Sequence, residues 1–186
     1  MAYIEPNEFI IEPKFQKEEV SQLAKQKMRK GFLNVLGGTG EMLDVELHLL
    51  PMLEISTLHQ KGLVFKKWEK NNFFFDPHVS IVHSYDLKNS AIPYNPKIKE
   101  SLGAKLLRQP IEYYYKQTEN AMIQQLFRKK LGSLTLQDLN KVKISIDSLI
   151  FYPFFVAHYQ KKLIAFDGLS KEISDEHTAF FERALR

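Results

Sequence analysis

Residues 141–171 read KVKISIDSLIFYPFFVAHYQKKLIAFDGLSK, and the fold prediction starts from this stretch. It contains two runs of β-branched and aromatic residues, which are typical of strands. The polar residues 160–162 separate the two runs, and Asp167-Gly168 ends the second run with a dipeptide that is common in turns. The stretch therefore predicts a β-hairpin that supplies much of the core.

The composition is that of a globular protein with a core. Of the 186 residues, 44% are hydrophobic and 26% are charged. Cysteine is absent, which excludes disulfide frameworks, thiolate nucleophiles and zinc held by cysteine. The longest apolar run, residues 149–157, is too short to cross a membrane, and the N-terminus lacks the basic start and apolar run of a signal peptide. We therefore expect a cytoplasmic protein with no membrane span.

The rest of the chain reads as helical and strand segments. Apolar residues recur at helical spacing in residues 17–36, and residues 43–86 show the alternation of a β-meander. Helical character resumes near residue 99, Pro110 fits the first turn of a longer helix, and Ser174 fits the N-cap of a final helix. The glycines in residues 37–40 follow a predicted helix, whereas a phosphate loop precedes one, so no cofactor is predicted.

The predicted fold class is α+β, with two similar halves that each combine a helix with an antiparallel sheet. Residues 1–86 form the first half, residues 87–97 form a linker rich in turn residues, and residues 98–186 form the second half with its hairpin and final helix. LHLLPMLEISTLHQKGLVF around Pro51 parallels LIFYPFFVAHYQKKLIAF around Pro153, which predicts an internal duplication; chance similarity is the alternative. This order of elements resembles small helix-plus-meander modules of the PepSY or cystatin-like kind, a resemblance that transfers no functional residue.

The aromatic run in the opening stretch predicts the first candidate function. Side chains alternate between the two faces of a strand, so one face cannot hide all of residues 151–156. Pro153 has no N–H for strand pairing and favours a bulge or an edge strand, which can pair with a partner. We expect a non-enzymatic protein-binding or assembly module that contacts a protein partner or a second copy through Tyr152, Phe154, Phe155 and Val156.

The basic region 99–143 supports nucleic-acid binding as an alternative. The chain carries a net charge of +4, and its excess of basic residues lies mainly in this region. Lys116 follows three tyrosines, and Arg128, Lys129 and Lys130 form a basic triplet, so the region combines stacking and cationic side chains as single-strand binders do. A solvated helix face with cations near its C-terminus explains the same pattern without nucleic acid.

The histidines support a third alternative, a metal-dependent enzyme with a histidine–carboxylate site. His48 shares one strand face with Asp44 and Glu46, and His78 and His83 lie further along the predicted meander. Their spacing matches no recognised ligand signature, and ordinary polar strand positions explain it equally well. The sequence therefore predicts no metal site, with His48, His78 and His83 as the alternative set.

His158 is a candidate general base. It follows the aromatic run, and Asp147 and Asp167 lie in the same region of the sequence. A general base needs a reactive partner within hydrogen-bond reach, and the sequence specifies none. We therefore interpret His158 as a polar position on a sheet.

Overall fold

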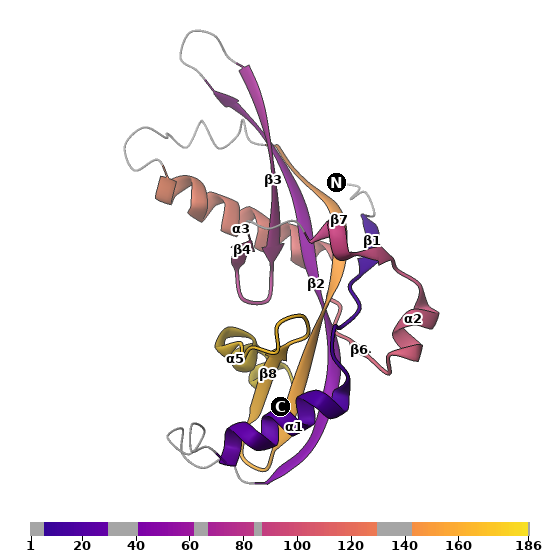
Figure 1. Ribbon diagram of the computed structural model, residues 1–186. Helices are drawn as coiled ribbons and strands as arrows, with labels where there is room; N and C mark the ends of the chain where they lie inside the picture. Colours follow the sequence, from indigo (N-terminus) through magenta and orange to yellow (C-terminus); the bar gives the residue numbers. More distant parts are fainter. Residues whose placement is uncertain (1–5, 30–40, 62–66, 84–86, 130–142, 186) are drawn as a thin grey trace. The chain divides into compact units, whose positions relative to one another are not determined.

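The computed structural model describes residues 6–29, 41–61, 67–83, 87–129 and 143–185, and within them it contains helices and a mixed sheet of eight strands (Figure 1). The helices are α1 (Lys17–Arg29), α2 (Pro96–Ser101), α3 (Ile111–Lys129) and α5 (Asp175–Ala184), with a 3₁₀ turn, η2 (Lys88–Ser90). The strands are β1 (Asn7–Ile10), β2 (Met42–Lys61), β3 (Lys67–Asp76), β4 (Ile81–His83), β5 (Ile92–Pro93), β6 (Lys105–Leu106), β7 (Lys143–Tyr159) and β8 (Leu163–Asp167).

The sheet has the strand order β4-β3-β2-β7-β1-β5, with β6 paired to β2 and β8 paired to β7. β3 and β8 run antiparallel to β2 and β7 respectively, whereas β6 runs parallel to β2. The predicted combination of helices and sheet is therefore confirmed. The parallel pair makes the sheet mixed, where the sequence predicted only antiparallel pairing.

Contacts divide the chain into two compact units, each built from three segments. Unit 1 comprises Met1–Phe9, Pro51–Ser90 and Arg108–Ile150, and unit 2 comprises Ile10–Leu50, Ala91–Leu107 and Phe151–Arg186. β2 and β7 supply residues to both units. The units thus interleave along the sequence instead of following one another, and an internal duplication is not shown.

Unit 2 buries both faces of its strands. One face packs with α1 in a core whose members include Val20, Ala24, Val45, Leu47, Phe155 and Phe166. Phe154 follows on the opposite face, because neighbours on a strand alternate, and the ring of His177 on α5 stacks on it with centroids 4.0 Å apart. Thr178 Oγ1, also on α5, accepts a hydrogen bond from Ala165 N at 2.9 Å. These contacts place α5 against the second face.

Capping residues fix where α5 begins. Ser174 is its N-cap in an extended conformation, and the Ser174 side chain accepts a hydrogen bond from the backbone N–H of His177. Asp175 and Glu176 follow in the first turn, where carboxylates are favoured by the helix dipole. The N-cap predicted from the sequence is confirmed.

β7 is an interior strand, so the edge strand expected from Pro153 is wrong. β2 lies on one side of β7, and β1 and β8 also pair with it. Ile11 N donates to Phe151 O, and Gly168 N donates to Pro153 O, both at 3.0 Å. On this side of β7, the hydrogen-bond partner changes near Pro153 from the segment after β1 to the segment after β8. A proline is tolerated at such a change of partner because no continuous row of hydrogen bonds is interrupted there.

Gly168 lies in close contact with Pro153, where β7 meets the segment after β8. A Cβ atom added there would lie 2.7 Å from Pro153 O and 2.8 Å from the Pro153 side chain, closer than such atoms approach. The turn that the sequence predicted after β8 thus requires glycine because the backbone passes directly over Pro153.

Unit 1 has its own core between its strands and α3. Its buried members are Leu53, Ile55, Phe75, Tyr114, Ala121, Ile146 and Leu149. The hydroxyl of Tyr114 accepts a hydrogen bond from Gln109 N at 2.7 Å, which fixes the start of α3. Asn71 and Asn72 lie within β3 and pair with Thr57 and Ser56.

Some sequence predictions fall partly on undescribed residues. The helix predicted over residues 17–36 begins at Lys17 and is described to Arg29. The glycines of residues 37–40 lie outside the described residues.

Candidate metal centre

Three potential metal ligands meet on one face of unit 2. Glu46 and His48 are two positions apart on β2 and therefore point to the same face, while Val45 and Leu47 point into the core. His158 lies near the end of β7, and Gln160 N donates to Glu41 O at 3.0 Å, which brings that end beside the start of β2. Strand alternation and pairing thus assemble the group from distant parts of the sequence.

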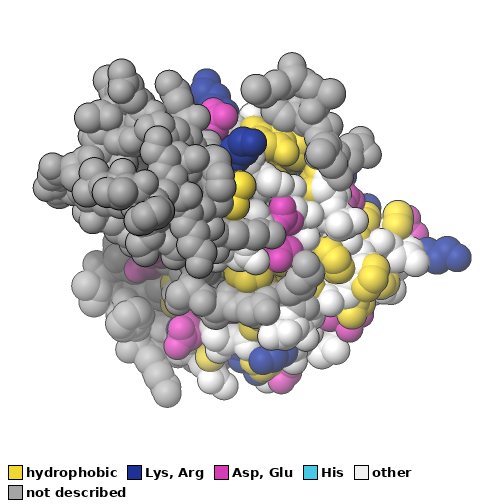
Figure 2. Space-filling view, turned by 90° about the horizontal axis from the view of Figure 1, so that it is seen from above, with side chains coloured by type: hydrophobic (Ala, Val, Ile, Leu, Met, Phe, Trp, Pro, Cys, Tyr) yellow, Lys and Arg dark blue, Asp and Glu magenta, His cyan; other side chains and the backbone are white. Residues whose placement is uncertain are grey.

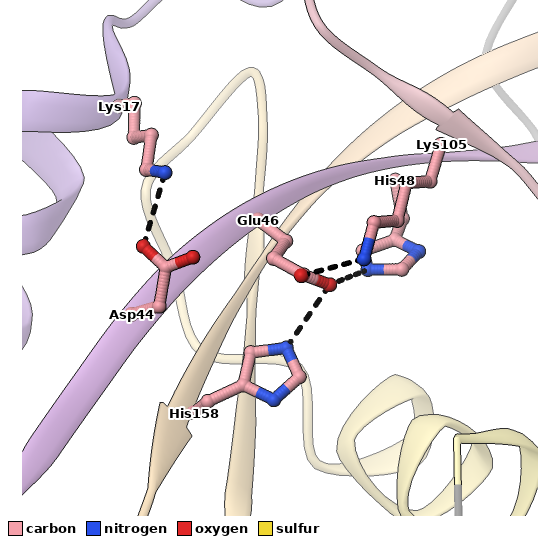
Figure 3. Close-up of polar contacts among 6 residues, drawn as sticks. All are labelled: Lys17, Asp44, Glu46, His48, Lys105 and His158. Carbon is pink, nitrogen blue, oxygen red and sulfur yellow. Dashed lines mark hydrogen bonds and ion pairs between the residues drawn. The ribbon is translucent and has the colours of Figure 1, made fainter.

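The carboxylate of Glu46 lies between the two imidazoles (Figure 3). His48 Nε2 donates to Glu46 Oε2 at 3.1 Å, and His158 Nε2 lies 3.3 Å from the same oxygen. One potential ligand atom from each residue lies within 4.8 Å of the others. Among the residues that the structure describes, this is the group of histidine and carboxylate side chains close enough to hold one ion.

Lys105 binds the other oxygen of Glu46. β6 pairs in parallel with β2, in a register that places Lys105 opposite His48. The Lys105 Nζ atom lies 2.6 Å from Glu46 Oε1, a short contact that is typical of a charge-assisted hydrogen bond. The Lys105 side chain remains 59% exposed, so this ion pair is open to solvent.

The pKa values of both His48 and Glu46 lie below their ordinary values. His48 is fully buried, and burial lowers its pKa below the ordinary value even though the hydrogen bond to Glu46 raises it. The ring of Phe181 covers His48 with centroids 5.1 Å apart. Burial alone would raise the pKa of Glu46, but hydrogen bonds from Lys105 and His48 outweigh it and leave that pKa below its ordinary value. A neutral imidazole and an ionised carboxylate are the forms that bind metals.

Two buried imidazole nitrogens in this group lack hydrogen-bond partners. They are His48 Nδ1 and His158 Nε2, and neither has a partner within the described part of the chain. His158 Nε2 faces Glu46 Oε2 at 3.3 Å without the alignment of a hydrogen bond. Buried polar atoms in native proteins usually have a hydrogen-bond partner, so a nitrogen whose contact with a carboxylate is an ion pair without a hydrogen bond is suited to a bound cation.

The spacing of these atoms fits a coordination sphere. Ligands about 2.0–2.2 Å from a zinc ion lie roughly 3–3.5 Å apart when they occupy adjacent positions. The two nitrogen–oxygen separations of 3.1 and 3.3 Å fall in this range. Two imidazoles and one carboxylate also form a common ligand set for Zn²⁺ and for non-haem Fe²⁺. The two imidazole nitrogens lie within 4.8 Å of each other. The donor types and the two nitrogen–oxygen separations therefore suit a divalent transition-metal ion.

A cleft of about 540 Å³ in unit 2 reaches Glu46, whereas neither His48 nor His158 lines it. Glu46 and Lys105 line it, together with residues that precede α1, the start of β2 and the segment after α2. Lys17 and Asp44 also line it and form an exposed ion pair of 3.0 Å. The cleft gives solvent, and therefore an ion, access to the carboxylate of Glu46.

The aromatic residues predicted to contact a partner lie in the core. Their exposed fractions are at most 4% within the described structure, for Tyr152, Phe154, Phe155 and Val156. The Tyr152 hydroxyl donates to Asp167 Oδ2 at 2.7 Å. The large apolar side chains that are exposed among the described residues are Leu43 and Ile92, and the face in Figure 2 intersperses apolar with charged side chains. A partner contact through the aromatic strand stays a prediction that this burial does not support.

The residues of the other two predicted sites lie in unit 1, except His48. His78 lies in the turn between β3 and β4, and His83 ends β4, whereas His48 belongs to unit 2. Lys116 is exposed on α3. α3 also contains Arg128 and Lys129, whose side chains lie outside the described structure, as does Lys130. Nucleic-acid binding and the metal set of His48, His78 and His83 stay predictions.

The sequence placed two of the three residues on one strand face but did not predict that His158 would meet them. The alternation of Glu46 and His48 was visible, and so was His158 as a separate polar position. Their meeting depends on the pairing of β7 with β2, which no local pattern specifies. Asp147 and Asp167, the carboxylates nearest to His158 in the sequence, bond Ser145 and Tyr152 instead.

No family model, curated protein or solved structure matches this chain. Among the described residues, no helix is both long enough and apolar enough to cross a membrane.

Proposed function

We propose that this protein binds a divalent transition-metal ion through Glu46, His48 and His158. The observation that carries the proposal is the buried Nε2 atom of His158, which faces Glu46 Oε2 at 3.3 Å without a hydrogen bond. A cation between these atoms would be coordinated by that nitrogen and would replace the Nε2 proton of His48.

Three potential ligands meet among the described residues, and this number supports a reactive rather than a purely structural ion. Structural zinc sites use four protein ligands, whereas catalytic sites use three and keep one position for water or substrate. Of the three residues, Glu46 lines the cleft of unit 2, and a fourth ligand would reach the ion from the side of Glu46. The reaction class follows from the ion: a metal-bound water is a nucleophile near neutral pH, and a metal-bound oxygen of a substrate is polarised.

Calorimetric titration of the metal-free protein with Zn²⁺ tests the proposal. We expect one ion per chain, with affinity lowered at least about tenfold by Glu46→Gln or His158→Ala, since changes beyond the ligands alone cost ~10–100-fold. Asp44→Asn is the matched control, because Asp44 shares the strand face and the electrostatic field of His158 but has its ion pair with Lys17. No binding, or equal affinity in all variants, would rule out this site.

Assembly and nucleic-acid binding remain separate proposals with their own test. Light scattering of the purified protein, before and after nuclease treatment, measures both. A defined oligomer would support assembly, and a nuclease-sensitive complex would support nucleic-acid binding by the basic region 99–143.

A further inference from the structure

We propose that Lys105 restricts Glu46 to coordination through one oxygen, so that the site selects a small four-coordinate ion over larger ions. This inference rests on the proposed metal-binding function, and it names the class of ion that the site takes. It concerns a positioning residue, because Lys105 would act through Glu46 and would not touch the ion.

The two oxygens of Glu46 have different neighbours. Oε2 faces both Nε2 atoms, at 3.1 Å from His48 and 3.3 Å from His158. Oε1 faces the Lys105 ammonium at 2.6 Å. An ion held by both imidazoles therefore meets only Oε2, unless Lys105 moves away.

The backbone of Lys105 is held in place. Lys105 and Leu106 pair with His48 and Leu49, and Leu107 N donates to Leu49 O at 3.1 Å. Ala104, the residue before β6, is buried in the core of unit 2. The Lys105 side chain thus starts from the strand beside His48, which keeps its ammonium near Oε1.

Lys17 provides a natural comparison. Lys17 pairs with Asp44 at 3.0 Å, and Asp44 lies on the same face of β2 as Glu46. Both side chains of this pair are more than half exposed. Within the described structure, neither His48 nor His158 forms a hydrogen bond or ion pair with Asp44. Lys17 therefore has the charge of Lys105 and lines the same cleft, without its relation to the ligand set.

One-oxygen coordination distinguishes ions by size. A four-coordinate ion such as Zn²⁺ is satisfied by two imidazoles, one carboxylate oxygen and one further ligand. Larger ions take more ligands at longer distances and often use both carboxylate oxygens. Binding a larger ion in that manner requires breaking the Lys105–Glu46 ion pair, so Lys105 disfavours it.

Visible absorption of the Co²⁺-loaded protein tests the inference, because four-coordinate Co²⁺ absorbs strongly and higher coordination weakens the band. We expect the strong band in the wild type, in Lys105→Arg, which keeps the charge, and in Lys17→Met. Lys105→Met should show the weaker band, and its preference for Zn²⁺ over Cd²⁺ should fall by about tenfold, the lower end of effects from residues beyond the ligands.

The outcomes separate the two proposals. A wild type that binds neither Co²⁺ nor Zn²⁺ overturns the metal site and this inference together. Binding with the same spectrum and the same ion preference in Lys105→Met overturns the role of Lys105 alone. Circular dichroism checks the folding of Lys105→Met, and Lys105→Ala serves as a second variant whose spectrum must agree with it.

Discussion

Each unit has carboxylate side chains on its strands, but the groups that contact these carboxylates differ between the units. In unit 1, Ser148 Oγ donates to Glu54 Oε2 at 2.7 Å, and Asp147 accepts hydrogen bonds from Ser145 and Ser56. In unit 2, Glu46 faces two imidazole nitrogens and one ammonium.

On the proposed function, this difference separates a structural network from a ligand set. Serine hydroxyls satisfy a buried carboxylate as neutral donors, which removes the cost of burying an unpaired group. Imidazole nitrogens near the same type of carboxylate provide lone pairs for a cation. On the proposed function, the same strands would support stability in unit 1 and hold an ion in unit 2, according to which side chains face the carboxylate.

The largest expected effect concerns the core of unit 2. Phe155→Asp places a charge where the native side chain is 2% exposed, and buried unpaired charges account for destabilisation above about 4 kcal/mol. We expect loss of the folded state, measured by circular dichroism and thermal melting. A folded monomer that has lost association would instead restore the aromatic strand as a partner surface.

A second prediction compares the two carboxylates directly. Saturating Zn²⁺ at about 100 times its dissociation constant should stabilise the protein by ~2.7 kcal/mol, because the ion binds only the folded state. This gain, read from thermal melting, should disappear in Glu46→Gln and persist in Glu54→Gln. Equal gains in both variants would remove the distinction between the units.

A third prediction concerns the network of unit 1. Ser148→Ala leaves the 8%-exposed Glu54 without one of its donors, which should lower the free energy of unfolding by about 1–3 kcal/mol. Chemical denaturation measures the change, and Zn²⁺ affinity should remain that of the wild type. Altered affinity would mean that the two carboxylate groups are coupled.

The smallest effect is a pH dependence that each unit should show. Burial raises the pKa of Tyr114 in unit 1 and of Tyr159 in unit 2 to about 12. Because the folded state keeps these protons longer than the unfolded state, stability is unaffected below about pH 10 and falls as pH rises towards 12, by ~1 kcal/mol per tyrosine at pH 11. Denaturation at pH 8 and 11 of Tyr114→Phe and Tyr159→Phe should show a reduced loss in each variant. An unchanged loss would mean that neither tyrosine titrates in this way.

The sequence predicted local elements well and their assembly poorly. The strand at residues 163–167 and the cap at Ser174 follow from alternation and side-chain hydrogen bonding, which are local. The interleaved units and the interior place of β7 depend on pairing between distant strands, which alternation does not encode. Pro153 led to the wrong prediction of an edge strand, because proline lacks the N–H that an interior strand uses for pairing. In the structure, β7 is interior, and its hydrogen-bond partner on one side changes near Pro153.

The candidate site follows the same division. Glu46 and His48 share a face by alternation, so half of the group was visible in the sequence. His158 and Lys105 reach it through the pairing of β7 and β6 with β2, and only the structure supplies that pairing.

Crystals of the Zn²⁺-loaded protein, measured at the zinc absorption edge, test the central claim most directly. The account predicts one anomalous peak about 2.0–2.2 Å from a nitrogen of His48, a nitrogen of His158 and an oxygen of Glu46. A peak at His78 or His83, or no peak in crystals of protein saturated with zinc, would contradict it.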